Sequence, residues 1–120
     1  MTLRSIDRPR RRPAPTSVLL DSGEVLHLTP GTVVVAVKSQ CDGCRHFLDG
    51  PVVAGWRVLP VAVDAESGAH DHVVTSAALV AALDIRSAPF FVAVDGSPLE
   101  VVSEGVPFDL AHLAEVLPAR

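Results

Sequence analysis

An unbroken apolar run, Val33–Val37, is separated by three residues from the pair Cys41 and Cys44, and this combination constrains the fold more than any other feature. A continuous run rich in β-branched residues, here Thr32–Val37, is typical of a strand buried on both faces in a parallel sheet. The cysteines follow where such a strand would pass into a helix, and the chain has no others. Two thiols at this spacing can close a small disulfide ring and open it again, which indicates a redox switch and not a structural staple.

Strand and helix signals alternate along the rest of the chain. Turn residues separate short β-branched runs, and later segments have helical spacing. The expected strands are Ser17–Leu20, Glu24–Leu28, Trp56–Val63, Phe90–Val94 and Leu99–Val102, with Pro60 marking an edge or a bulge. The first expected helix starts after Cys41 and ends within about two turns, at Asp49-Gly50-Pro51. The second covers Ala77–Leu83 after a cap at Thr75 or Ser76, and the last has Leu110, Leu113, Ala114 and Leu117 on one face. This order predicts an α/β fold with a mixed central sheet, helices on both faces and an N-terminal β-hairpin.

Composition excludes several classes of function. The 120 residues suit one domain with one core. The formal charge is −4 and the chain has four Phe, one Trp and no Tyr, so we expect no nucleic-acid partner. No segment is long enough to insert into a membrane, and no apolar stretch follows Arg8–Pro13 as an export signal would require. Residues 1–16 are rich in arginine and proline, so we expect a disordered tail before a domain over residues 17–120, in a cytoplasmic protein.

The chain resembles the thioredoxin-like superfamily over residues 17–118. The matching features are the strand followed by Cys41-Asp42-Gly43-Cys44, the segment Arg86–Pro89 before the Phe90–Val94 strand, the turn at Asp95-Gly96, and Gly105 followed by an amphipathic helix. The segment Leu20–Val25 is similar to the TlpA-like and peroxiredoxin-like branches. The resemblance implies a thioredoxin-like fold in which a cis Ala88–Pro89 bond faces the cysteines.

The same resemblance implies the site of a thiol–disulfide oxidoreductase that needs no cofactor. Cys41 would be the nucleophile and Cys44 the resolving thiol. The substrate would be a disulfide of a protein or small molecule, with a separate electron donor. Lys38 and His46 could stabilise the thiolate or carry protons. The residues expected to bind substrate are Gln40, Asp42, Gly43, Ala88 and Pro89.

Asp42 bears on the direction of electron transfer. A carboxylate beside the nucleophile disfavours the thiolate, whereas strong oxidants of this kind owe their potential to a stabilised thiolate. We therefore predict a reductant.

Departures from the family pattern keep alternatives open. Gln40 stands where a Trp is usual, Val35 occupies the place of a buried acid, and Lys38 replaces the Thr of peroxidases, so a peroxidase is not expected. One alternative is a non-catalytic adaptor with the same fold. The other is zinc binding, because His46 and His70-Asp71-His72 add imidazoles to the two thiols; we assign no metal ligand.

Overall fold

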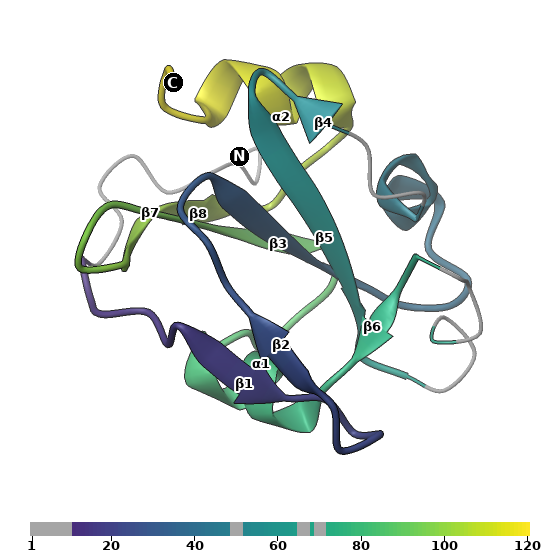
Figure 1. Cartoon of the computed structure of the whole chain (residues 1–120). Helices are drawn as coiled ribbons and strands as arrows, with labels where there is room; N and C mark the ends of the chain where they lie inside the picture. Colours follow the sequence, from purple (N-terminus) through teal and green to yellow (C-terminus); the bar gives the residue numbers. More distant parts are fainter. Residues whose placement is uncertain (1–10, 49–51, 65–67, 69–71) are drawn as a thin grey trace.

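The computed structural model describes residues 11–48, 52–64, 68 and 72–120 (Figure 1). Its elements in chain order are β1 (Ser17–Leu19), β2 (Val25–His27), β3 (Thr32–Val37), the 3₁₀ helix η1 (Asp42–Phe47), β4 (Val52–Val53), β5 (Trp56–Ala62), β6 (Val74–Thr75), α1 (Ala77–Ala82), β7 (Phe90–Asp95), β8 (Glu100–Gly105) and α2 (Leu110–Val116). The predicted α/β class is therefore confirmed.

The main sheet is mixed, with strand order β4-β5-β3-β7-β8, and β6 also pairs with β5. β3 is parallel to β5 and antiparallel to β7. The register places Val37 opposite Ala62, Ala36 opposite Phe90, and Phe91 opposite Gly105. The ends of β3, β5 and β8 and the start of β7 therefore meet at one end of the sheet.

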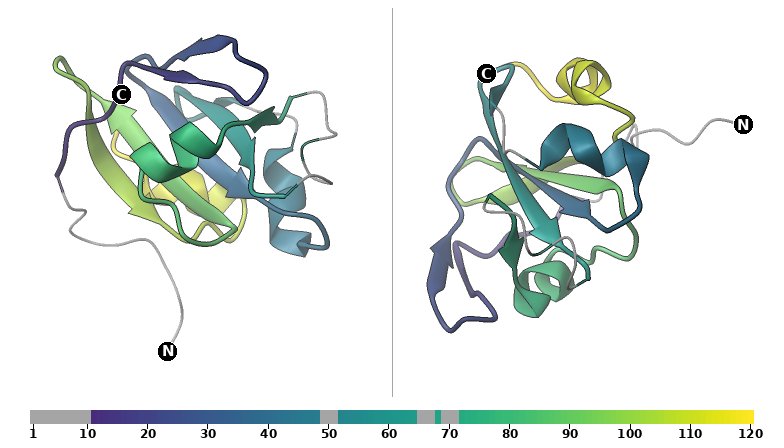
Figure 2. Two further views of the ribbon diagram at one scale, coloured as in Figure 1. Left: turned by 90° about the horizontal axis from the view of Figure 1, so that it is seen from below. Right: turned by 90° about the vertical axis from the view of Figure 1, so that its right-hand side faces the viewer.

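Helices cover both faces of this sheet, as predicted (Figure 2). Val33, Val35 and Val37 pack in the cluster that contains Phe47 of η1 and Leu113 of α2. The intervening β3 residues pack in a second cluster with side chains of α1. This period of two, combined with burial on both sides, is the reason that β3 has no charged position and only Thr32 as a polar one.

The N-terminal hairpin is confirmed as a separate two-stranded sheet of β1 and β2. It is attached to the start of α1, where the Ser76 hydroxyl donates a 2.6 Å hydrogen bond to the Leu19 carbonyl. The same hydroxyl accepts from the Leu79 N–H at 3.0 Å, so Ser76 is the N-cap of α1. The Asp21 N–H also donates to the Thr75 carbonyl.

Residues 12–14, which were expected in the tail, lie along the edge strand β8 and Leu99 just before it. Residues 1–10 lie outside the described part of the chain. The Val101 N–H donates to the Arg12 carbonyl, and the Ala14 N–H donates to the Leu99 carbonyl. Pro13 forms a bridge with Glu100, and Ala14 is buried. Local composition did not predict this pairing, because the partners lie nearly ninety residues further along the chain.

The segment after Cys41 forms a helix of about two turns, as expected, but a tighter one than an α-helix. It forms η1, a 3₁₀ helix of six residues with only Cys44 and Phe47 buried. The residues expected to end it, 49–51, lie outside the described part of the chain. The helix is held to the sheet by very few side chains.

The expectation that Pro60 marks an edge fits the pairing of β5: one side of this strand pairs with β3 from Arg57 to Ala62, and the other side is covered only in part. The N–H groups of Arg57 and Val63 point to the β3 side, where they donate to Gly31 and Val37 carbonyls. By alternation the Pro60 nitrogen points to the other side. On that side β4 pairs only with residues 56–57 and β6 only with residues 61–62. The missing donor thus falls in the gap between two short strands.

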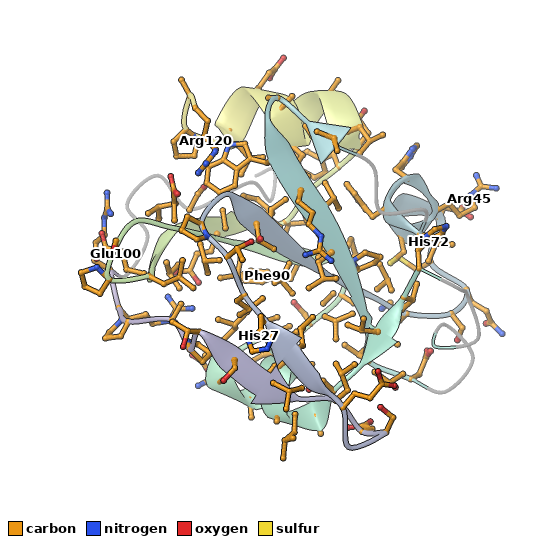
Figure 3. All side chains as sticks on the ribbon, in the orientation of Figure 1. His27, Arg45, His72, Phe90, Glu100 and Arg120 are labelled. Carbon is orange, nitrogen blue, oxygen red and sulfur yellow. A yellow bond between two sulfur atoms is a disulfide. The ribbon has the colours of Figure 1, made fainter. Side chains whose placement is uncertain are left out.

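The C-terminal residues close over Trp56, which is fully buried. Its indole Nε1–H donates to the Pro118 carbonyl at 2.9 Å, and the Arg120 guanidinium lies 5.3 Å from its ring centroid. Arg120, labelled in Figure 3, also pairs with Asp95. Among the described residues, no helix is long and apolar enough to cross a membrane.

Candidate active site

Cys41 and Cys44 are joined by a disulfide at the end of the sheet to which β3 leads, with their Cα atoms 5.3 Å apart. Cys41 is the N-cap of η1, and the Cys44 N–H donates to the Cys41 carbonyl at 3.1 Å. The two cysteines differ in their exposure to solvent: Cys44 is 1% exposed, whereas Cys41 is only half-buried. An attacking group can therefore reach Cys41 but not Cys44.

The loop between β3 and Cys41 is held by Asp64. One carboxylate oxygen of Asp64 accepts hydrogen bonds from both the N–H and the hydroxyl of Ser39, each at 2.8 Å. Gln40 then takes a left-handed backbone conformation, with φ of 52°, which turns the chain into Cys41. Sequence reasoning missed Asp64. The available signal was its position directly after the second parallel strand, because parallel strands bring their carboxyl ends to one edge.

Pro89 lies beside the cysteine turn. The Ala88–Pro89 peptide bond is cis, as is Ser97–Pro98. A Cβ atom placed on Gly43 would lie 3.7 Å from Pro89 Cγ, so the glycine backbone is in ordinary contact distance of the proline ring. Ala88 and Pro89 are both half-buried. The structure therefore brings together the two segments that the sequence resemblance had paired.

The other predicted site residues surround this centre. Gln40, Asp42, Lys38 and His46 are exposed, and Asp42 directly follows Cys41. Arg45, labelled in Figure 3, is a further exposed cation on η1 that the sequence analysis did not single out. These side chains supply the polar surroundings of a largely apolar centre.

Two exposed apolar side chains lie at the same end of the sheet. Val63 directly follows β5 and is 43% exposed, and Phe108 lies three residues after β8 and is 42% exposed. Because the strand order is β5-β3-β7-β8, Cys41 and Pro89 come between them. Both views of Figure 2 show the connections after β3 and β8 at this end.

Among the described residues, the candidate zinc ligands do not form a metal-binding group. His70 and Asp71 lie outside the described part of the chain, and His72 is exposed. Within residues 11–48, 52–64, 68 and 72–120, no group of three or more His, Cys, Asp or Glu side chains is arranged to hold a metal ion.

Comparison of the chain with models of protein families, with curated proteins and with solved structures gave no match. Functional inference therefore depends on the disulfide, its unequal exposure and the neighbouring proline. These features are compatible with redox activity.

Proposed function

We propose that the protein is a thiol–disulfide oxidoreductase with a thioredoxin-like fold, with Cys41 as nucleophile and Cys44 as resolving thiol. The observation that carries this proposal is a disulfide between a half-buried Cys41 and a fully buried Cys44. A structural disulfide gains most by closing a long loop, and this one spans three residues. The unequal exposure of the two cysteines instead suits two different roles. The more exposed Cys41 can meet the substrate, and the buried Cys44 acts second.

The reaction needs only the two cysteines and an external dithiol. The Cys41 thiolate attacks one sulfur of a substrate disulfide; a Cys41–substrate bond forms, the substrate S–S bond breaks, and the departing thiolate takes a proton. The Cys44 thiolate then attacks the Cys41 sulfur, which releases the second substrate thiol and closes the Cys41–Cys44 disulfide. Two electrons pass to the substrate, and a dithiol donor restores the reduced protein.

The segments around the disulfide are proposed to bind the substrate in an extended conformation. The half-buried Ala88 and Pro89 and the turn at Gly43 would flank the attacked sulfur, with Gln40 and Asp42 at the rim. Lys38 and His46 are proposed modulators of the thiolate, because both side chains are exposed on segments next to the disulfide. The partners are a protein or small-molecule disulfide and an electron donor.

The protein is proposed to act as a reductant. A six-residue 3₁₀ helix offers a Cys41 thiolate only a short run of aligned peptide dipoles. The exposed Asp42 carboxylate, next in the chain, adds a negative charge. A thiolate without strong stabilisation makes the reduced form a better electron donor. We also propose a cytoplasmic location, where dithiol donors keep such pairs reduced.

The first experiment is turnover with insulin as the disulfide substrate. Reduced protein with a dithiol donor should precipitate the insulin chains, and the Cys41→Ser variant should not. The Cys44→Ser variant should accumulate a mixed disulfide with the substrate at Cys41. If the native protein shows no turnover and the Cys44→Ser variant captures no substrate, the oxidoreductase proposal is wrong.

A non-catalytic adaptor is the second candidate, and it is favoured by the fully buried, apolar Val35. That position offers no proton acceptor for the second thiol. An adaptor would bind its partner equally well when both cysteines are replaced by serine, whereas the oxidoreductase would lose covalent exchange.

A further inference from the structure

Arg12 joins three elements that are distant in sequence. Its guanidinium donates to both carboxylate oxygens of Glu104, from Nη1 at 2.9 Å and from Nη2 at 3.2 Å. Nη2 also donates to the Leu83 carbonyl at 2.9 Å. The Arg12 carbonyl in turn accepts the N–H of Val101. The N-terminal segment, the C-terminal end of α1 and strand β8 are therefore tied together at one side chain.

The Arg12–Glu104 pair is largely removed from water. The side chain of Glu104 is 2% exposed and that of Arg12 is 21% exposed. Apolar replacements of such a pair are often as stable as the pair itself, so stability alone is a poor explanation of its presence. A bidentate guanidinium–carboxylate contact does fix geometry, because two parallel hydrogen bonds set both distance and orientation.

The geometry that Arg12 fixes is that of the connection between α1 and β7. At one end of this connection, Leu83 is the C-cap of α1 and presents its carbonyl to Arg12. Near the other end, Val92 of β7 lies opposite Glu104 in the register with β8. One guanidinium therefore ties the start of residues 84–89 to Glu104, on the strand paired with β7.

Pro89 is the last residue of that connection and lies against the turn at Gly43. Within the connection, buried Ile85 donates its N–H to the Val80 carbonyl, so its first part is also anchored. With few residues between Leu83 and β7, we expect a shift of the Leu83 end to be passed on to Ala88 and Pro89.

We propose that Arg12 is a positioning residue that holds Pro89 beside the Cys41–Cys44 turn and thereby sets how readily the disulfide reacts. Its importance for turnover rests on the proposed oxidoreductase function. The contact itself and its effect on the disulfide can be measured without any substrate.

The test compares Arg12→Gln with Arg11→Gln. Arg11 is a matched control: it lies in the same segment and pairs with Glu100 of β8 at 2.6 Å, but its side chain is 62% exposed. The readouts are the second-order rate constant for reduction of Cys41–Cys44 by dithiothreitol and the NMR signals of Gly43 and Pro89. Exchange rates follow access to the attacked sulfur, so Arg12→Gln should raise the rate constant roughly tenfold and shift both signals. Arg11→Gln should change neither.

A second variant separates positioning from stability. The double replacement Arg12→Met with Glu104→Leu removes both buried charges and should unfold no more easily than Arg12→Gln. It still lacks the donor to the Leu83 carbonyl, so its disulfide should stay as reactive as that of Arg12→Gln. A native rate constant in the double variant, or equal rate constants in Arg12→Gln and Arg11→Gln, would overturn the proposal. Dithiothreitol reduces the pair whether or not insulin is a substrate, so failure of the proposed function would be seen separately.

Discussion

Phe47→Ala should destabilise the protein strongly, because Phe47 is the main anchor of η1. Only Cys44 and Phe47 of this helix are buried, and the Phe47 side chain is 0% exposed. It packs in the same cluster as Val35, Val37 and Trp56. Removing a buried phenylalanine ring costs about 3–5 kcal/mol, from lost transfer energy and the cavity that remains. A domain of this size has a total stability of about 5–15 kcal/mol, so the loss would be a large part of it.

Phe108→Ala provides the matched control, since it removes the same ring from a position that is 42% exposed. Its ring centroid lies 4.6 Å from that of His112, and losing this surface contact should cost less than about 1 kcal/mol. Equilibrium unfolding of the oxidised proteins in urea measures both values. With an m-value of about 1–3 kcal/mol per molar, the midpoint for Phe47→Ala should fall by roughly 2–3 M. Equal midpoints for the two variants would refute the view that Phe47 anchors the helix carrying Cys44.

Three further predictions concern the site. Asp42→Asn should make the reduction potential about 10–30 mV less negative, because the carboxylate beside Cys41 no longer opposes the thiolate; a shift to a more negative value in glutathione equilibration would contradict this. Phe108→Ala should slow reduction of a peptide disulfide flanked by apolar residues and leave reduction of hydroxyethyl disulfide unchanged; equal losses with both would show that the ring does not contact substrate. Asp64→Asn should cost about 1–2 kcal/mol in urea unfolding, since the two bonds from Ser39 lose their charged acceptor. An unchanged midpoint would mean that Asp64 does not hold the loop.

The central layers of the fold were predictable because they follow short-range rules. The continuous apolar run predicted that β3 is buried on both faces, and the cysteines, separated from it by three residues, indicated that the candidate site lies after the end of this strand. Turn residues predicted both hairpins, and Ser76 predicted the start of α1. Pro89 was placed near the cysteines by resemblance, and the structure brings it to Gly43.

The features that were missed depend on partners far along the chain. Residues 11–16 have the composition of a tail, and only the pairing of Arg12 with Glu104 and Val101 shows that they belong to the sheet edge. Asp64 has no local pattern that connects it to Ser39, because the contact arises from the parallel pairing of β3 and β5. The 3₁₀ geometry of η1 was missed for a different reason: helical propensity does not distinguish a short 3₁₀ helix from the first turns of an α-helix.

Pro60 and the pairing of residues 12–14 with β8 have a common consequence for self-association. Unpaired backbone donors along a sheet margin recruit strands from other molecules, and this is a frequent origin of aggregation. On the side of β5 that faces away from β3, Pro60 offers no N–H in the gap between β4 and β6. The opposite margin of the sheet is occupied along the first part of β8 by the chain's own residues. Both margins are thus protected against strand addition at these places, which lowers the risk of self-association through the sheet.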